Sequence, residues 1–308
     1  MAAPRRLRTR SRWKEFPGGP DMKNHMQTLL ILLLGAFSSL CSPKTLAAEG
    51  YSNCEGFIDS LPAIITAQGV WCLRKDLNTA ISAGSAIDIR TNNVTIDCND
   101  FKVGGLAGGA ATSAYGVRAV SALNTTIRRC TMRGFYIGVG LTGSGHVIEN
   151  NRIDANTYIG IEIAGDASVV RHNLVADTGG STTAGGYAVG IKAGGAVDVI
   201  DNTVSGVVGN PNASNIALAY GISTHHLSGS IAGNRVRGLV PSGTGTVHGI
   251  NNQENGRISI RANDVTGNGG AGTGIFCTFP IGSALSNVIS GFSTGLSGCT
   301  TLDNLIVP

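Results

Sequence analysis

Three side chains in the middle of the sequence have types and spacing that suit proton transfer: Lys192, Tyr220 and His225. Tyr220 and His225 lie in one short segment, Tyr-Gly-Ile-Ser-Thr-His, and both residue types serve as general acids or bases. An ammonium group such as that of Lys192 can neutralise a carboxylate. The set therefore suits removal of a proton from the carbon next to a carboxylate, and we predict these three residues as catalytic.

The residues belong to a repeating pattern that runs nearly to the end of the chain. One unit reads HVIENNRIDANTYIGIEI, from His146 to Ile163, with an asparagine in its middle and Gly-Ile near its end. The asparagine position is filled by Asn99, Cys130, Asn151, Asn173, Asn202, Asn234, Asn263, Asn287 and Asn304. The Gly-Ile position is filled by Ala86-Ile87, Gly116-Val117, Gly138-Val139, Gly160-Ile161, Gly190-Ile191, Gly221-Ile222, Gly249-Ile250, Gly274-Ile275 and Gly295-Leu296.

The composition of each unit predicts strands rather than helices. Short runs rich in Val and Ile alternate with polar residues and are separated by Gly, Asn, Ser and Thr, without a 3.6-residue period. One unit contains three such runs: Gly160 to Ile163, Val169-Val170 and Leu174-Val175, with Asn173 at the turn between the last two. Stacked asparagines at such a turn can hydrogen-bond to one another as a ladder. Repeats of this length indicate a solenoid, whose ends need caps.

The unit V-x-I-x-x-N-x-I, with its asparagine turn, resembles the right-handed parallel β-helix repeat of the pectin-lyase-like superfamily. The resemblance covers roughly residues 86–308. It implies an all-β, single-domain solenoid of about nine three-strand coils, with residues 48–85 as an N-terminal cap. The pattern is specific for the fold and not for a reaction, because function on such a fold depends on particular sites.

A second resemblance concerns the segment Tyr220-Gly221-Ile222-Ser223-Thr224-His225-His226. It is similar to the Tyr-Gly-Phe-Asp-Pro-His motif of mannuronan C5-epimerases and related alginate lyases. In those enzymes the tyrosine and histidine serve as acid and base on a uronic acid, and Tyr220 and His225 match them by position. Ser223 stands in place of the acidic residue, and Thr224 in place of the proline. The resemblance implies a uronic-acid polymer as the partner.

In a β-helix, the residue after each Gly-Ile points outward, and successive coils lie about 4.8 Å apart. That column reads Asp88, Arg118, Gly140, Glu162, Lys192, Ser223, Asn251, Phe276 and Ser297. Two residues further on, a second outward column reads Thr142, Ala164, Gly194, His225 and Gln253. The two columns form one face, and His248 directly precedes its glycine beside it. Mixed charges and amides on this face suit a sugar polymer, so we predict substrate contacts from Glu162, Ser223, His248, Asn251 and Gln253. In the superfamily such a face forms a groove walled by loops, here residues 178–186, 208–218 and 239–246.

A simpler interpretation of the same residues stays open. The face can be an ordinary solvated strand surface on which Glu162 pairs with Arg118 or Lys192, since exposed ion pairs are common and weak. Tyr220 can be a packing residue, because Tyr115, Tyr136, Tyr158 and Tyr187 also precede the Gly-Ile step. The alternative function is then a non-catalytic surface, adhesive or glycan-binding protein.

Other chemistries find less support in the sequence. Glycoside hydrolysis by paired carboxylates needs a second acidic residue near Glu162, and the same column offers only distant Asp88. Calcium needs several clustered carboxylates, and adjacent His225 and His226 point to opposite faces of a strand. We therefore predict no metal and no cofactor.

The N-terminal residues predict export. Residues 1–21 are rich in Arg and Pro and suggest a mis-assigned start or an extension, whereas 22–47 combine Lys23, the apolar run LLILLLGAF and Thr45-Leu46-Ala47. That order is typical of a signal peptide, and the run is too short to span a bilayer. Residues 1–47 hold 8 of the 23 Lys and Arg and 2 of the 19 Asp and Glu, which leaves 15 basic and 17 acidic residues. We expect a secreted or periplasmic monomer that binds neither nucleic acid nor membrane.

Six cysteines remain beyond the signal segment. An even count in an exported protein favours disulfides, and no Cys-x-x-Cys spacing occurs. Cys277 and Cys299 follow the Gly-Ile positions of successive repeats, and Cys98 and Cys130 lie beside or at successive asparagine positions. The predicted pairs are Cys54 with Cys72, Cys98 with Cys130 and Cys277 with Cys299. Alternatively, Cys130 fills an asparagine position as a small buried residue.

Overall fold

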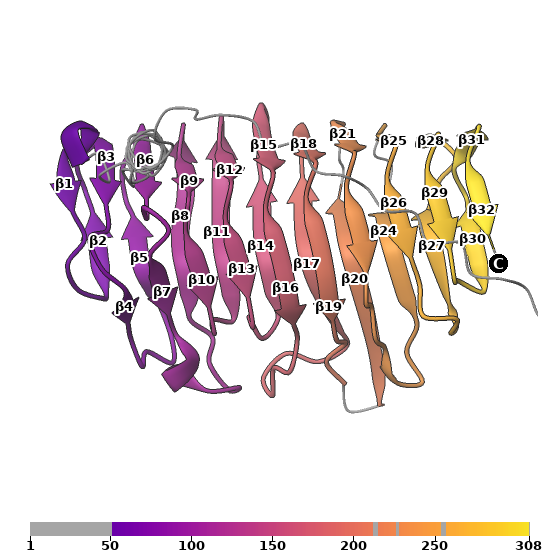
Figure 1. Ribbon diagram of the computed structural model, residues 1–308, viewed down its shortest axis with the longest axis horizontal. Coiled ribbons are helices and arrows are strands. Elements are labelled where there is room, and N and C mark those ends of the chain that lie inside the picture. The colour runs from indigo at the N-terminus through magenta and orange to yellow at the C-terminus, as the bar shows by residue number, and fades with distance from the viewer. Residues whose placement is uncertain (1–50, 212–214, 226–227, 254–256, 308) are drawn as a thin grey trace, which may run out of the picture. The chain divides into compact units, whose positions relative to one another are not determined.

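A computed structural model describes residues 51–307 apart from 212–214, 226–227 and 254–256. In the described part of the chain, successive coils stack along one axis, and their strands form three sheets of parallel strands (Figure 1). Sheet A contains β1 (Gly56–Phe57), β3 (Gly69–Cys72), β6 (Val94–Asp97), β9 (Thr126–Arg128), β12 (Val147–Glu149), β15 (Ser168–Arg171), β18 (Val197–Ile200), β21 (Ser230–Ala232), β25 (Ser259–Arg261), β28 (Ser283–Leu285) and β31 (Thr300–Leu302).

Sheet B carries the outward columns. It contains β2 (Ala63–Ile65), β5 (Ser85–Ile89), β8 (Tyr115–Leu123), β11 (Ile137–Ser144), β14 (Ile159–Ala164), β17 (Tyr187–Gly194), β20 (Ile216–His225), β24 (Val247–Gln253), β27 (Gly272–Cys277) and β30 (Thr294–Ser297). The short strand β23 (Ser242–Gly243) pairs antiparallel with the start of β20.

Sheet C closes each coil. It contains β4 (Leu77–Asn78), β7 (Lys102–Gly104), β10 (Thr131–Arg133), β13 (Arg152–Asp154), β16 (Leu174–Thr178), β19 (Thr203–Val207), β22 (Arg235–Arg237), β26 (Asp264–Thr266), β29 (Val288–Ser290) and β32 (Leu305–Val307). Two 3₁₀ turns complete the described elements, η1 (Tyr51–Asn53) and η2 (Leu106–Gly108). The predicted β-helix is confirmed. Strands β1 to β4, from the segment expected to be a cap, supply the first strands of all three sheets.

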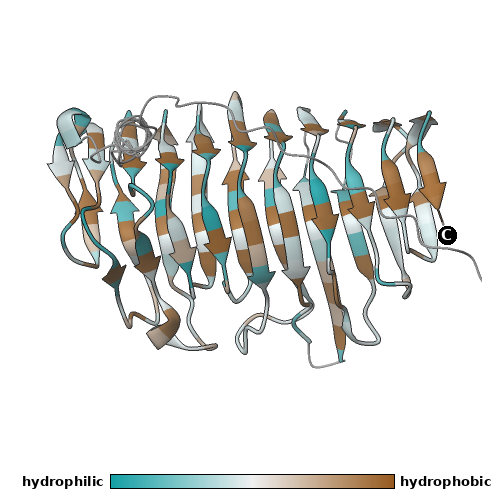
Figure 2. Ribbon diagram, in the orientation of Figure 1, coloured by the Kyte–Doolittle hydropathy of each residue, from teal (hydrophilic) through white to brown (hydrophobic). Residues whose placement is uncertain are grey.

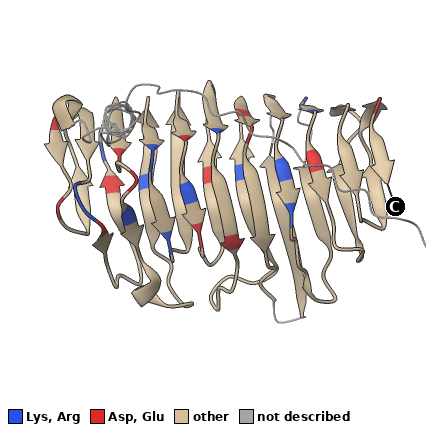
Figure 3. Cartoon of the chain, in the orientation of Figure 1, with Lys and Arg blue, Asp and Glu red and all other residues tan. Residues whose placement is uncertain are grey.

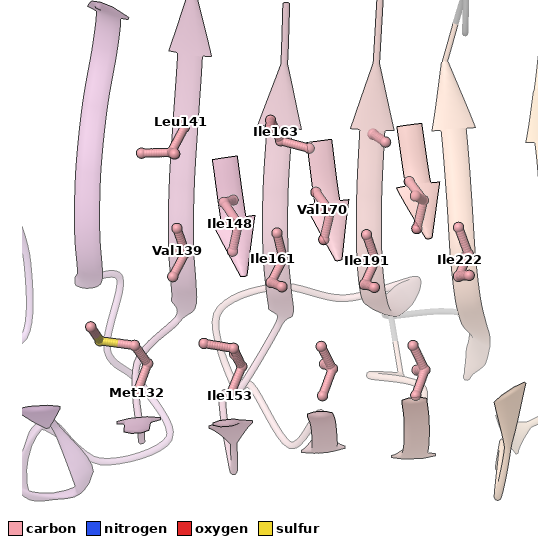
Figure 4. Packing of buried hydrophobic residues seen from close by; sticks show 14 of the residues in the cluster. Met132, Val139, Leu141, Ile148, Ile153, Ile161, Ile163, Val170, Ile191 and Ile222 are labelled. Atoms are coloured by element: carbon pink, nitrogen blue, oxygen red, sulfur yellow. The ribbon is translucent and has the colours of Figure 1, made fainter. Parts of the chain in front are cut away.

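The core consists of columns of aliphatic side chains that each coil adds at the same position. Val139, Ile161, Ile191 and Ile222 follow one another on sheet B, each with no more than 1% of its surface exposed (Figure 4). Bands of apolar residues therefore recur at similar levels of successive strands (Figure 2). Because side chains alternate between the two faces of a strand, this buried column leaves the residue after each isoleucine facing outward.

The predicted asparagine ladder is confirmed at the turn between sheets A and C. From Asn151 to Asn287, the backbone N–H and the Nδ2 of each asparagine donate to the Oδ1 of the next, at 2.9–3.0 Å. The ladder ends at Asn304. These amides are almost fully buried, so their satisfied hydrogen bonds hold the coils in register.

All three predicted disulfides are confirmed: Cys54–Cys72, Cys98–Cys130 and Cys277–Cys299. Cys130 also occupies the asparagine position, because its backbone N–H donates to Asn151 Oδ1 at 3.0 Å. The half-cystine thus replaces one amide of the ladder with a covalent link between coils. Three disulfides are typical of proteins that fold in an oxidising compartment.

Candidate functional site

The two outward columns on sheet B lie as predicted. Strand register places Glu162 beside Lys192, Lys192 beside Ser223 and Ser223 beside Asn251. The second column continues from Gly194 to His225 and Gln253. Charged residues of both signs occur on neighbouring coils (Figure 3). The central strands β14, β17, β20 and β24 therefore carry the polar groups from which a site can be built.

The three residues predicted to be catalytic line one surface hollow of about 340 Å³. Its lining residues are Tyr187, Val189, Lys192, Tyr220, Ser223, His225 and Gln253. A second hollow of about 290 Å³ shares Lys192 and His225 with the first and extends past Gly194 and Ala164 to Glu162. Lys192 and His225 therefore stand where two hollows meet. Volumes of this size suit part of a small ligand or a segment of a polymer.

Lys192 is already engaged within the protein. Its Nζ donates to Glu162 Oε1 at 2.9 Å, and the two side chains are 28% and 27% exposed. Burial alone would lower the pKa of Lys192, but the hydrogen bond and charge of Glu162 outweigh it and raise the pKa above 10.5. Lys192 is therefore a cation at neutral pH, with a carboxylate at its side. The ion pair expected in the simpler interpretation is present.

Tyr220 belongs to a continuous row of aromatic rings along sheet B, in which Tyr136 and Tyr158 directly precede strands β11 and β14. We call this set the aromatic row, and its members are Tyr136, Tyr158, Tyr187, Tyr220, His248 and Phe276. Ring centroids of neighbours lie 4.7 to 6.1 Å apart, within the range of favourable ring contacts. Tyr220 is only 9% exposed, so it packs within the row and also lines the hollow. Packing and access to a ligand coexist at this residue.

The tyrosines that precede the Gly-Ile step do not all lie at the same level of sheet B. Tyr220 pairs with Val189 of the preceding coil, whereas Tyr187 pairs with Leu218. Tyr187 and Tyr220 are therefore offset along their strands, although their rings are neighbours in the aromatic row. Burial and the nearby Tyr187 raise the pKa of Tyr220 above 10, so its hydroxyl stays protonated at neutral pH. Tyr220 is suited to donate a proton rather than to accept one.

The predicted substrate contacts differ in access. Ser223 and Asn251 are 3% and 2% exposed, and Ser223 lines the main hollow whereas Asn251 lines neither hollow. Asn251 Nδ2 donates to Ser223 Oγ at 3.5 Å and so supports Ser223 from the next coil. Gln253 lines the main hollow. His248 lies between Tyr220 and Phe276 in the aromatic row, and burial lowers its pKa below 6.5. Its ring is therefore neutral at neutral pH.

The residues that line the two hollows come from other segments than those expected to wall a groove. Among described residues, their lining comes from strands of sheet B and not from loops 178–186 or 239–246. Tyr187 and Val189 line the main hollow although the sequence did not single them out as contacts. Their position in the sequence could have indicated this role, because both residues precede Gly190 on the strand next to that of Tyr220. In the part of the chain that the structure describes, no group of three or more His, Cys, Asp or Glu is placed to hold a metal.

The profile of the right-handed β-helix region matches residues 72–236 and 115–280. The chain belongs to this right-handed β-helix family. The resemblance found in the repeat is thereby confirmed over most of the β-helix. No curated protein matches this β-helix, and no described helix is long and apolar enough to cross a membrane. The predicted signal peptide, residues 22–47, and the segment 1–21 lie outside the described residues.

Several solved structures share the fold at low identity. The Dettilon tailspike protein is 16% identical over 82% of this chain, which covers 60% of the tailspike, with a TM-score of 0.47. The A-module of the Azotobacter vinelandii mannuronan C-5 epimerase AlgE6 is 13% identical over 82% of this chain and 88% of its own, with a TM-score of 0.43. DFA-IIIase from Arthrobacter chlorophenolicus A6 is 14% identical, with 77% and 69% covered and a TM-score of 0.41. These likenesses concern the fold alone.

Proposed function

We propose that this exported β-helix binds a polysaccharide containing uronic acid on sheet B and moves the proton next to its carboxylate, as a lyase or epimerase does. The observation that carries the proposal is the meeting of Lys192, Tyr220 and His225 in one hollow of about 340 Å³. These are a cation, a proton donor and a second acid–base group. Their types and positions match the demands of this reaction.

Each residue has a role in the proposed reaction. His225 removes the proton from the carbon next to the carboxylate, and the electron pair passes into the carboxylate, whose charge Lys192 stabilises. In a lyase, the pair then forms a carbon–carbon double bond as the glycosidic bond breaks, and Tyr220 protonates the leaving oxygen. In an epimerase, Tyr220 instead returns a proton to the opposite face of the same carbon. The raised pKa of Tyr220 supports the donor role.

The remaining predicted contacts surround this set. Glu162 accepts a hydrogen bond from the Lys192 ammonium at 2.9 Å and partly neutralises its positive charge. Gln253 stands in the hollow, where its amide can hydrogen-bond to sugar hydroxyls. Ser223 lines the hollow and is supported by Asn251, and His248 packs against Tyr220 in the aromatic row.

Solvent exchange and ultraviolet absorbance together provide the test. An epimerase working in D₂O incorporates deuterium next to the carboxylate of recovered alginate, pectate or glycosaminoglycan, whereas a lyase removes that hydrogen and creates ultraviolet-absorbing unsaturated ends. Lys192→Gln, Tyr220→Phe and His225→Gln should each reduce the rate of exchange, or of formation of unsaturated ends, at least about a hundredfold. Tyr158→Phe is the matched control, because it removes a hydroxyl from the aromatic row outside the hollow's lining. Neither deuterium exchange nor unsaturated ends on any acidic polymer would refute the catalytic proposal.

A non-catalytic glycan-binding role is the second candidate. The Lys192–Glu162 ion pair favours it, because a ligand carboxylate must compete with Glu162 for the ammonium. The aromatic row also offers sugar rings an apolar edge along several coils. Retention of an acidic polymer with neither deuterium exchange nor unsaturated ends, weakened by Lys192→Gln, would identify this role.

A further inference from the structure

Arg118 is the one cation of the first outward column that has no carboxylate partner among the described residues. The adjacent carboxylate in the column, Asp88, is taken by Arg90, whose Nε donates to Asp88 Oδ2 at 2.6 Å. The Arg118 guanidinium instead lies over the ring of Tyr115, 5.1 Å from its centroid. A planar cation held on an aromatic ring keeps its hydrogen-bond donors available to an anion.

The Tyr115 ring beneath Arg118 packs against the backbone of the next coil. A Cβ on Gly140 would lie 2.8–2.9 Å from the Tyr115 ring, so the ring rests where a side chain of the outward column would otherwise stand. Tyr115 is thereby fixed across β11, and Arg118 is exposed above it. Because Gly140 has no side chain, the Tyr115 ring can occupy this position beneath the Arg118 guanidinium.

Arg118 lies on the same face as the proposed site. Sheet register leads from Arg118 on β8 through Gly140 and Glu162 to Lys192 on β17, three coils away. At about 4.8 Å per coil, the two cations are about 14 Å apart along the axis. The second column between them carries only the short side chains of Thr142 and Ala164. A surface hollow of about 370 Å³ is lined by residues 88–92 of the coil before Arg118 and by residues 120–122 of its own coil.

We propose that Arg118, held on Tyr115, is a second carboxylate subsite, so that one acidic polysaccharide strand runs along sheet B from Lys192 to Arg118. This inference rests on the proposed function of the Lys192 hollow and adds the direction and the length of the bound chain. Guanidinium groups suit carboxylates because they offer paired donors in one plane. Arg118 takes no part in the proton transfer; it sets affinity for long acidic chains.

The test is calorimetric binding of a size series of uronic-acid oligosaccharides, from the disaccharide upward, to the mature protein. Arg118→Gln should weaken binding of oligomers that span both cations about fivefold. It should leave the shortest binding oligomers unchanged. Tyr115→Leu should weaken binding of the long oligomers in the same way, because it removes the aromatic ring beneath Arg118 and keeps the positive charge. Arg90→Gln is the matched control: it removes an equal charge nearby, from a side chain already paired with Asp88.

The outcomes separate the two proposals. If wild-type protein binds these oligosaccharides and Arg118→Gln binds every length equally well, the Arg118 subsite is wrong and the Lys192 site stands. An equal loss in Arg118→Gln and Arg90→Gln also overturns the subsite, because net charge alone would then explain it. If the wild-type protein binds no uronic-acid oligomer of any length, the proposed function and the subsite both fail.

Discussion

Replacing Glu162 by glutamine tests whether the Lys192–Glu162 ion pair weakens or strengthens binding of an acidic ligand at Lys192. The pair joins Lys192 Nζ to Glu162 Oε1 at 2.9 Å, and both side chains are a little more than a quarter exposed. An ion pair with that much solvent contact contributes about 1 kcal/mol, less than a buried pair and at the upper end of exposed ones. A ligand carboxylate that takes over the ammonium must offset this contribution.

In Glu162→Gln, the ammonium is available without that competition. The main influence that raises the pKa of Lys192 is removed, yet a lysine with an ordinary pKa near 10.5 remains charged at neutral pH. We therefore expect acidic oligosaccharides to bind about fivefold more tightly, as 1 kcal/mol implies. The gain should shrink at high salt, because screening weakens the new contact.

The assay is isothermal titration at low and high salt, with Glu149→Gln as the control. Glu149 pairs with Arg171 at 2.6 Å on sheet A, so this variant removes the same charge from another face. Equal gains in both variants would mean that net charge, and not the release of Lys192, increases affinity. Weaker binding by Glu162→Gln would refute the reasoning and make Glu162 a direct substrate contact.

Three further predictions concern stability. Asn202→Ala removes four buried side-chain hydrogen bonds and should lower the free energy of unfolding by about 3 kcal/mol; exposed Asn92→Ala, which removes one, should cost under about 1 kcal/mol, and equal losses in urea unfolding would contradict the ladder's role. Burial lowers the pKa of His146 below 6.5, so its contribution to stability is complete above that pH and is lost as the pH falls towards the folded-state pKa. Urea midpoints should therefore drop between pH about 7.5 and about 5.5, and less steeply in His146→Asn; identical slopes would exclude His146 as the cause. Replacing Cys277 and Cys299 together by alanine opens a link across 22 residues and should cost about 3 kcal/mol, whereas an unchanged midpoint would show that the disulfide adds no stability.

The repeat explains why so much of the fold could be predicted. In a solenoid each coil contacts only its neighbours, so equivalent positions in the sequence become neighbours in space. Asn173 therefore meets Asn202, and Cys277 faces the coil of Cys299, without any knowledge of long-range folding. The same reasoning brought Lys192 and His225 to one face.

Tertiary structure alone decided what those neighbours do. The sequence offered both Arg118 and Lys192 to Glu162, and side-chain packing gave Lys192 the carboxylate and Arg118 the ring of Tyr115. Rotamers and local burial determine such choices, and the period of a repeat does not contain them. Tyr187 lies two residues further from its Gly-Ile step than Tyr220, and only the packing of the side chains shows that their rings are neighbours. The sequence determined which residues share a face because strand periodicity is local; the structure decided which are paired, buried or open to a ligand because those properties depend on all surrounding side chains at once.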